Sequence, residues 1–344
     1  MKQRLSAIPA VLFLFLLFSS FISTGNGQSY NHRFEDPSGI PEKKHKTLRI
    51  CVISDLNSSY GSTTYSNDVK ALIMDLSSIK PDIIVCGGDM VAGQKATLTE
   101  ENINTMWAAF KSTVLDPIRN LKIPFGFTVG NHDASPSYIK DRKLSRKFWI
   151  DNAESTGLSF IDSTHYPFYY SYIKDEVFFM SWDAAGAQIS PEVFDWMKMQ
   201  LNTKTARKAK LRILAGHLPL YAITESKNKA GEVNSDPEAA LKFFKANGLD
   251  LYISGHQHAY YPAEKEGIRF LNAGAIGDGP RKLIGNDTPP RKAYTLIDVP
   301  LKRADQFRYR TFVPQSNIEI DLSSLPDSVI GFNGVSRLEK LNHK

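Results

Sequence analysis

Five short polar motifs, each directly after an apolar and largely β-branched run, constrain the fold of this chain more than any other feature of its sequence. Such runs predict buried strands, so each motif falls where a strand gives way to a loop. Asp, Asn and His side chains on several strand ends provide the oxygen and imidazole ligands that a group of metal ions needs on a rigid frame. The motifs are Asp55-Leu56-Asn57, Gly88-Asp89, Gly130-Asn131-His132-Asp133, Gly216-His217 and Gly255-His256-Gln257-His258.

The order of the predicted elements indicates a layered α/β architecture, because apolar strand runs alternate with helical segments. In the first half of the chain the predicted strands are 48–53, 82–86 and 124–129, and the predicted helices are 65–79 and 100–114. The later predicted strands are 167–173, 176–182, 211–215, 249–254, 268–272 and 292–299, and the later predicted helices are 141–147, 190–201 and 237–247. Two β-rich segments, 307–313 and 318–320, are assigned to the same domain.

The N-terminus has the layout of a secretory signal. Lys2 and Arg4 precede a short apolar stretch, residues 10–18, which is followed by small residues. The stretch is shorter than the ~20 apolar residues of a membrane span. The sequence therefore predicts a signal peptide at 1–27, a polar linker at 28–46 and one domain at 47–344. The predicted location is periplasmic or secreted, and an uncleaved N-terminal membrane anchor is the alternative.

The composition is that of a globular protein with a sizeable core, since 42% of the residues are hydrophobic and 23% are charged. The formal net charge of +6 comes largely from scattered Lys and Arg residues, which indicates solubility and some attraction for anions. No nucleic-acid partner is expected from this pattern. No stable membrane span is expected after removal of the signal, and the oligomeric state stays open.

The two cysteines, Cys51 and Cys86, lie inside apolar strand runs just before Asp55 and Asp89. Small buried thiols that pack as hydrophobic groups are the favoured state for both. A disulfide between neighbouring strands is the alternative, because export permits it.

The order of the five motifs resembles that of the calcineurin-like metallophosphoesterase superfamily, over most of the chain from Leu48 to about Val299. The resemblance implies an α/β fold of two packed mixed β-sheets flanked by helices, a four-layer sandwich. It also implies a metal-dependent phosphoric ester hydrolase, either a phosphatase or a phosphodiesterase, whose substrate is a phosphate mono- or diester.

The resemblance implies a role for each motif residue. Asp89 would bridge two metal ions, and a hydroxide that bridges the same ions would attack phosphorus. His132 would assist the leaving group, and Asp133 would orient His132. One ion would take Asp55, residue 57, Asp89 and His258, and the other would take Asp89, Asn131, His217 and His256.

Asn57 departs from the pattern, because the family usually has His at this position. An Asn oxygen is a harder, neutral ligand, which favours Mn, Fe or Mg at the Asp55 site and leaves Zn possible at the other. Tyr60 is close enough in sequence to be an alternative ligand. The other interpretation of Asn57 is an Asx turn in the loop.

Several other residues have both a functional and a structural interpretation. Arg281, in a Gly-rich loop, is a candidate for phosphate binding. The basic run Lys140, Arg142, Lys143, Arg146 and Lys147 either attracts anionic substrate or forms a solvated helix face, which is favoured. Tyr260 and Tyr261 either stack on a leaving group or pack in the core. His45 and His165 are expected at the surface or in packing.

Substrate identity stays open among a nonspecific or acid-type phosphatase, a cyclic-nucleotide or phospholipid diesterase and a nucleotide hydrolase. A different class is a noncatalytic metal- or phosphate-binding protein that retains the fold. Asn57 favours this class, whereas the intact pair of His132 and Asp133 opposes it, because binding alone has no chemical need of that pair.

Overall fold

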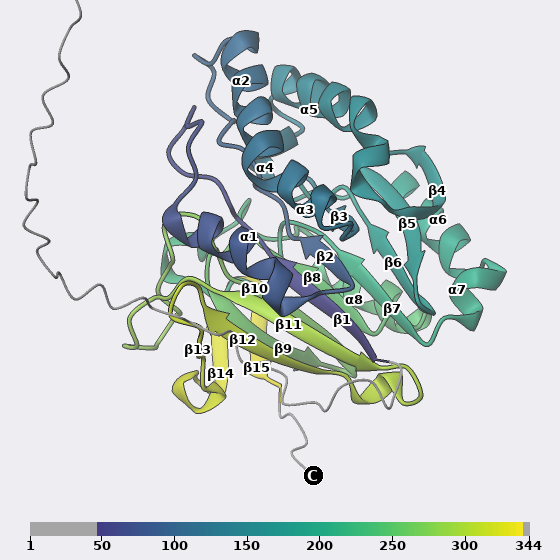
Figure 1. Cartoon of the computed structure of the whole chain (residues 1–344). Coiled ribbons are helices and arrows are strands. Elements are labelled where there is room, and N and C mark those ends of the chain that lie inside the picture. Colours follow the sequence, from purple (N-terminus) through teal and green to yellow (C-terminus); the bar gives the residue numbers. More distant parts are fainter. Residues whose placement is uncertain (1–46, 340–344) are drawn as a thin grey trace, which may run out of the picture. The chain divides into compact units, whose positions relative to one another are not determined.

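The computed structural model describes residues 47–339, whose apolar runs form the strands of two mixed β-sheets (Figure 1). In the described residues the first sheet has six strands, in the order β13 (Ile318–Glu319), β12 (Arg308–Val313), β11 (Tyr294–Pro300), β1 (Thr47–Ile53), β2 (Ile83–Cys86) and β3 (Phe125–Phe127). The second has nine, in the order β14 (Ser328–Gly331), β15 (Gly334–Leu338), β9 (Tyr260–Lys265), β10 (Ile268–Ala273), β8 (Leu251–Ser254), β7 (Leu211–Ala215), β6 (Val177–Ser181), β5 (Tyr169–Lys174) and β4 (Ser159–His165).

Each sheet combines a parallel part with an antiparallel part. In the first sheet β1, β2 and β3 are parallel, and β11 pairs with β1 in the antiparallel sense. In the second sheet β6, β7, β8 and β10 are parallel. The carboxyl ends of parallel neighbours meet at one edge, and loops at that edge are the usual place for ligands in α/β sheets.

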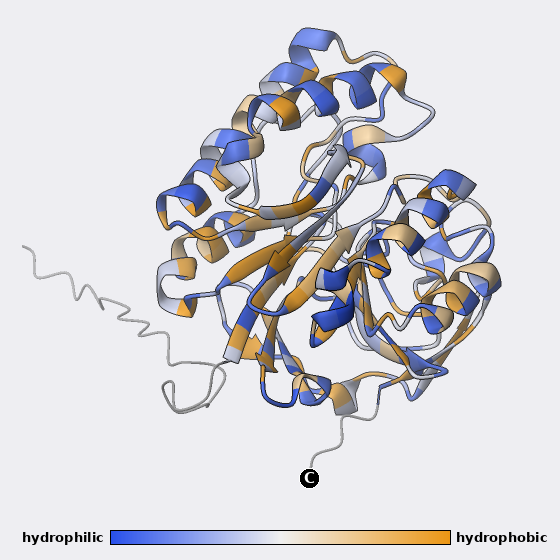
Figure 2. Cartoon of the chain, turned by 90° about the vertical axis from the view of Figure 1, so that its right-hand side faces the viewer, coloured by the Kyte–Doolittle hydropathy of each residue, from blue (hydrophilic) through white to orange (hydrophobic). Residues whose placement is uncertain are grey.

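Helices cover the sheets with their apolar sides. They are α1 (Asn67–Ile79), α2 (Glu100–Phe110), α3 (Asp116–Asn120), α4 (Asn131–Ala134), α5 (Ile139–Asp151), α6 (Pro191–Leu201), α7 (Lys204–Lys208) and α8 (Pro237–Ala246). In α1 the side chains of Val69, Leu72, Ile73 and Leu76 are buried, which is the spacing of one helix face. Figure 2 shows the result, with hydrophobic strands inside and hydrophilic residues on the outer sides of the helices.

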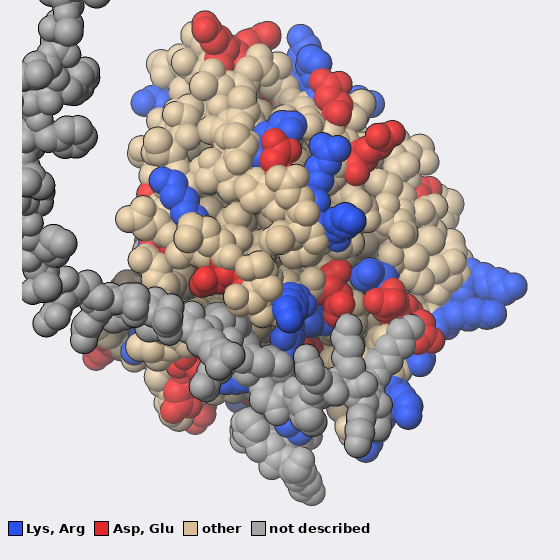
Figure 3. All heavy atoms as spheres, in the orientation of Figure 1, with Lys and Arg blue, Asp and Glu red and all other residues tan. Residues whose placement is uncertain are grey.

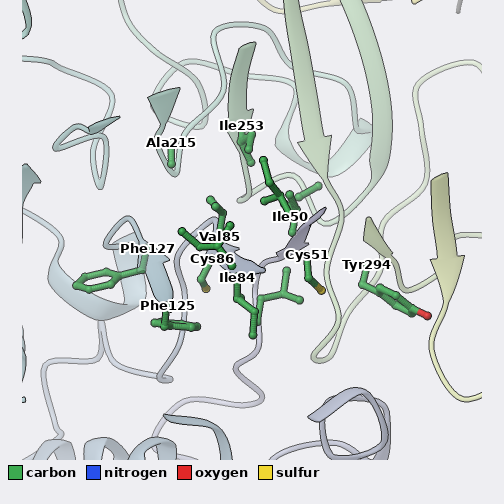
Figure 4. Packing of buried hydrophobic residues seen from close by; sticks show 14 of the residues in the cluster. Ile50, Cys51, Ile84, Val85, Cys86, Phe125, Phe127, Ala215, Ile253 and Tyr294 are labelled. Carbon is green, nitrogen blue, oxygen red and sulfur yellow. The ribbon is translucent and has the colours of Figure 1, made fainter. Parts of the chain in front are cut away.

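The central strands of the second sheet are buried on both faces, because their successive residues belong to two different hydrophobic clusters. In β8, Leu251 and Ile253 join the cluster that contains the first sheet, whereas Tyr252 joins the cluster that contains α6 and α8. Ala215 and Ile253 lie near Ile50 and Val85 of the first sheet in the first cluster (Figure 4). Because successive side chains of a strand point to opposite faces, this sheet packs on the first sheet on one side and on helices on the other. The result is four layers in the order helices, sheet, sheet and helices. The predicted fold class is confirmed.

Most predicted elements are found with shifts of a few residues at their ends. The helix predicted at 65–79 begins at Asn67, because the side chain of Ser66 caps it by accepting from the Val69 N–H. The segment predicted as one helix at 100–114 is α2, which continues as a π-helical turn, Lys111–Leu115, before α3. The structure adds strands β4, β9, β14 and β15 and helix α7, none of which was predicted.

Cys51 and Cys86 are free and buried, as predicted. They lie on the neighbouring strands β1 and β2, where Cys51 pairs with Ile84 and Cys86 pairs with Ile53. Burial raises the pKa of Cys51 to about 12, so this thiol stays protonated and acts as a small hydrophobic group.

The predicted signal peptide (1–27) and linker (28–46) lie outside the described residues, as does His45. Among residues 47–339 no helix is both long and apolar enough to cross a membrane. On the face shown in Figure 3, acidic and basic side chains are interspersed, which agrees with a modest net charge made of scattered residues.

Candidate metal centre

The five motifs meet because they follow the carboxyl ends of parallel strands in both sheets. Asp55, Asp89 and Asn131 follow β1, β2 and β3, and His217 and His256 follow β7 and β8. Contacts join the two sheets at this edge. The His217 Nδ1 lies 2.8 Å from the Gly87 carbonyl oxygen, and the His256 N–H donates to the Asp55 carboxylate at 3.1 Å.

Two motif glycines allow the loops to approach this closely. A Cβ added at Gly130 would lie 2.1 Å from Oδ1 of Asp89, and one added at Gly255 would lie 2.1 Å from Oγ of Ser54 and 2.6 Å from Oδ2 of Asp55. Neither position has space for any side chain, so glycine here is a condition for assembling the carboxylates of Asp55 and Asp89.

Four predicted ligands adopt left-handed backbone conformations that L-residues rarely occupy. The φ angle is 51° at Asp55, 54° at Asp89, 66° at His256 and 53° at His258. Such conformations cost on the order of 1–3 kcal/mol each and persist where the surrounding structure enforces them, typically at functional sites. Each one turns the chain sharply at the end of a strand.

Four donor atoms converge where the resemblance places one metal ion. The Asn131 Oδ1 lies 2.9 Å from both the His217 Nε2 and the His256 Nδ1, and these two nitrogens are 3.3 Å apart. The Asp89 Oδ2 lies 3.3 Å from the His217 Nε2. Separations of this size are what a metal ion imposes on ligands at bond lengths of ~2.0–2.1 Å.

The outward nitrogen of each imidazole is held by an acceptor. The His217 Nδ1 faces the Gly87 carbonyl at 2.8 Å, the His256 Nε2 faces the Glu232 carboxylate at 2.8 Å, and the His258 Nδ1 faces the Gly279 carbonyl at 2.9 Å. A proton on each outward nitrogen leaves the lone pair of the other nitrogen directed inward, as in metal-binding histidines. The side chains present therefore fit a metal ion.

A second group of donors surrounds Asp55. The His258 Nε2 lies 3.1 Å from the Asp55 Oδ1, and ligand atoms of Asp55, Asp89 and His217 all lie within 4.8 Å of one another. Asn57 is buried, and its Nδ2 donates to the Val91 carbonyl at 3.2 Å. Within residues 47–339 no donor reaches its Oδ1, which leaves this oxygen for a ligand role.

Tyr60, the alternative ligand, lies at the rim. Its side chain is 55% exposed, and its ring centroid is 5.2 Å from that of His132 at a tilt of 42°. Asn57 is therefore the better placed of the two candidates for the Asp55 group.

The charges of the cluster favour a cation between the carboxylates. Burial lowers the pKa of His217, but the carboxylates of Asp89 and Asp55 outweigh burial and raise it to about 9. Burial and the Lys227 ammonium lower the pKa of His256 to about 3, so this imidazole is neutral and able to bind a metal ion.

His132 is the second residue of the short helix α4, and its side chain is 21% exposed. Its backbone N–H donates to the Asp89 Oδ1 at 2.9 Å, and its Nδ1 lies 3.1 Å from the Gly93 carbonyl oxygen. The Nε2 atom lies 3.9 Å from the Asp89 Oδ2, toward the centre.

Asp133 is expected from the resemblance to orient His132. Its carboxylate accepts backbone N–H groups from Met90 at 2.8 Å, Val91 at 3.0 Å and Gly130 at 2.8 Å. Asp133 thus fixes the two loops that carry Asp89 and His132, and Gly93 is the group that orients the ring.

The predicted basic run forms part of α5, and most of its side chains have hydrogen-bond or ion-pair partners nearby. Lys140 donates to the Leu98 carbonyl, Lys147 pairs with Asp151, and Arg142 pairs with Asp183 and donates to the Ala134 carbonyl. Arg142 also lies over the Phe168 ring at 3.7 Å. These contacts agree better with a helix face that is solvated and packs against its neighbours than with a surface that attracts anionic substrate.

Of the remaining candidates, some make packing contacts and one, Arg281, lies at the rim of the site. Tyr260 and Tyr261 are buried, so they pack, and His165 is exposed and stacks on Tyr169. Arg281 is half-buried, its backbone N–H donates to the His258 carbonyl at 3.0 Å, and its Nη1 donates to Ser226 at 3.0 Å.

Sequence reasoning missed Glu232, Lys227 and Gly93. Glu232 and Lys227 lie in a polar loop, residues 225–235, that has no motif of its own. The signal that could have indicated an acceptor is chemical: a metal-binding histidine needs a partner for its second nitrogen, which is often a carboxylate.

The comparisons with known proteins agree with this geometry. A family model described as calcineurin-like phosphoesterase matches residues 48–260. Purple acid phosphatase 17 of Arabidopsis thaliana is 24% identical over 286 residues, which cover 80% of this chain and 80% of that protein.

Two solved structures share the fold. Purple acid phosphatase PPD1 from seeds of yellow lupin (Lupinus luteus) has a TM-score of 0.61 at 14% identity and covers 81% of this chain. The match covers 53% of the lupin chain, so this chain spans about half of that length. GAP50, described as the anchor in the inner membrane complex of Plasmodium, has a TM-score of 0.51 at 14% identity, with 86% of this chain and 90% of that chain covered. The chain therefore belongs to the calcineurin-like phosphoesterase family of metal-dependent phosphoric ester hydrolases.

Proposed function

We propose that this protein is an exported phosphoesterase that uses two metal ions to hydrolyse a phosphate mono- or diester, with His132 assisting the leaving group. One observation carries the proposal. Three histidines have their outward nitrogens on Gly87, Glu232 and Gly279, and their inward lone pairs converge with Asn131, Asp55 and Asp89. An arrangement of inward lone pairs and carboxylates is suited to metal ions rather than to a purely protein network.

The residues would divide into two ligand groups that share Asp89. Asp55, Asn57 and His258 would hold one ion, and Asn131, His217 and His256 would hold the other. When bound, such ions supply Lewis acidity to the phosphoryl oxygens and activate the attacking water. Oxygen-rich ligands in the Asp55 group favour Mn, Fe or Mg there, and the two imidazoles of the other group also suit Zn.

His132 is suited to hold a proton for the leaving oxygen. Since its Nδ1 faces the Gly93 carbonyl, the ring uses Nε2 toward the centre. With a proton on both nitrogens, the Nε2–H can be donated to an alkoxide or phenolate as the bond to phosphorus breaks. Partial exposure of the side chain lets a leaving group of varied size reach it.

Export is supported by the N-terminal sequence, in which Lys2 and Arg4 precede the apolar stretch 10–18. A direct test is to express the full chain and determine the N-terminus and location of the product. Export and cleavage near residue 27 are expected.

The function is tested with two chromogenic substrates, a nitrophenyl phosphate and a bis-nitrophenyl phosphate. The signal-free protein is stripped of metal and reloaded with Mn²⁺, Fe²⁺, Zn²⁺ or Mg²⁺, and its metal content is measured alongside turnover. Metal-dependent hydrolysis supports the proposal, and the preferred ester separates a monoesterase from a diesterase. Absence of bound metal under every condition would contradict it.

A noncatalytic binding protein is the second candidate. Asn57 favours it, and the fold neighbour GAP50 is described as an anchor. The test above distinguishes the two, because a binding protein would take up metal or phosphate without turning over either ester.

A further inference from the structure

A buried lysine lies beside the metal centre, outside the five motifs. Lys227 ends a 3-10 turn, Glu225–Lys227, and is only 9% exposed. Its Nζ lies 3.2 Å from Nδ1 and 3.3 Å from Nε2 of His256. Buried ammonium groups are costly unless they are paired, so this position calls for an anionic partner.

The two nearly equal distances define how the ammonium lies. An in-plane hydrogen bond to one imidazole nitrogen would leave the other nitrogen markedly farther away. The Lys227 Nζ therefore lies over the His256 ring and not along either lone pair. A cation in this position gains from the ring but does not use its N–H donors fully.

The same two nitrogens have other partners when a metal ion is bound. The His256 Nε2 faces the Glu232 carboxylate at 2.8 Å, and its Nδ1 is directed at the ligand group of Asn131 and His217. Neither nitrogen then has a lone pair for Lys227. Within residues 47–339 the remaining partner of its Nζ is the Glu232 Oε2 at 3.5 Å.

The surroundings of Lys227 indicate an anion that comes from outside the chain. Arg281 is close enough to oppose its charge and is tied to the neighbouring Ser226 by its Nη1 at 3.0 Å. Two cationic side chains thus lie on the His256 side of the centre. Of the carboxylates that act on Lys227, those of Glu232, Asp89 and Asp55, the last two are candidate metal ligands. A tetrahedral anion with several acceptor oxygens would use the spare ammonium donors.

We propose that Lys227 binds a phosphoryl oxygen of the substrate and that Glu232 positions both this lysine and His256. The inference rests on the proposed function, since it assumes that a phosphoester occupies the centre. Glu232 accepts the His256 Nε2–H and pairs with Lys227. Its side-chain carboxylate therefore links the metal ligand to the phosphate-binding cation.

The test compares Lys227→Met with Lys229→Met in the metal-loaded, signal-free protein. Lys229 is an exposed lysine two residues away in the same loop and has no part in the centre. Binding of inorganic phosphate is measured by calorimetry, with metal content determined on the same samples. We expect Lys227→Met to weaken phosphate binding about 10- to 100-fold, the scale of a lost charge-assisted hydrogen bond, at unchanged metal content. Lys229→Met should match the wild type.

Two further variants keep the test valid should Lys227→Met fold poorly. Lys227→Gln and Lys227→Arg both retain an N–H donor near Glu232, but only arginine retains the charge. The phosphate affinity of Lys227→Arg is expected to lie within about threefold of the wild-type value, and that of Lys227→Gln to be at least about tenfold lower. For Glu232→Gln, the affinity of one metal ion should fall about 10- to 100-fold, because the His256 orientation is lost.

The outcomes separate this inference from the proposed function. Phosphate binding by Lys227→Gln within twofold of Lys229→Met would overturn the role of Lys227, whatever the turnover of the wild type. Wild-type protein that binds metal and phosphate without hydrolysing esters would contradict the proposed function, and the variants would still decide whether Lys227 holds the anion.

Discussion

The Nδ1 atom of His132 lies 3.1 Å from the carbonyl oxygen of Gly93, which leaves Nε2 as the ring nitrogen that faces Asp89. Gly93 follows the Gly88-Asp89 motif on the same loop. The loop that carries the predicted bridging carboxylate therefore also fixes the ring orientation of the predicted proton donor.

Replacement of His132 should damage turnover more than metal binding. For His132→Ala we expect kcat to fall about 10²- to 10⁴-fold, the usual contribution of a general acid, at an unchanged metal content. His165→Ala is a matched control, because that histidine is exposed and stacks on Tyr169. Unchanged kcat in His132→Ala would remove this residue from the mechanism.

Asp89 and His217 should differ in how much metal their loss releases. Asp89→Ala removes the ligand that both groups share, so both ions should be lost together with activity. His217→Ala removes a ligand from one group, so about one ion per chain should be lost and activity abolished. Elemental analysis of dialysed protein measures both. Full metal content in His217→Ala would contradict the ligand assignment.

Asn57→His should change metal preference rather than abolish function. A second imidazole in the Asp55 group makes the site softer, which should raise its affinity for Zn²⁺ relative to Mn²⁺. Competition between the two metals, followed by activity of the reloaded protein, measures the shift. Collapse of activity with every metal would show that the loop tolerates no larger side chain here.

Gly255→Ala should destabilise the fold through steric overlap. The new Cβ would meet Ser54 and Asp55, and overpacking of this kind costs on the order of 3 kcal/mol. Gly267→Ala is the control for backbone strain alone, since Gly267 has a φ of 83° and no atom near its Cβ position. About 1 kcal/mol is expected there. Equal losses in urea unfolding would argue against the close approach.

Stability should depend on pH through Asp68. Burial raises the pKa of this carboxyl, but hydrogen bonds from Lys292 and Gln315 outweigh burial and lower it below its ordinary value. A lowered folded-state pKa contributes stability above the unfolded value of about 4, and the contribution is lost as pH falls through the folded value. Asp68→Asn should therefore be less stable than the wild type at pH 6. The difference in unfolding free energy should shrink below pH 4, and a constant difference would contradict this origin.

The sequence was sufficient for the fold class and for locating the candidate ligands, because each motif directly follows an apolar run that forms a strand in the structure. The apolar run 249–254 made β8 recognisable, and the motif directly after it located His256. β4 was not predicted because a mostly exposed strand has little apolar pattern. β9 was not predicted because Pro262 and two consecutive tyrosines are not typical of a strand with alternating apolar residues.

The partners of the histidines could not be predicted in the same way. Gly87, Gly93 and Gly279 act through backbone carbonyls, which any residue type provides. Glu232 acts through its side chain but reaches His256 from a loop whose path depends on tertiary structure.

The candidate ligands come from two sheets and from positions as far apart as Asp55 and His258. Neither sheet alone can complete either ligand group, since Asp55 and Asp89 follow strands of one and the histidines follow strands of the other. With these ligand groups, firm retention of metal would require that the two sheets have already docked. The ions would bind late in folding, and they would stabilise the folded chain but not its partly folded forms.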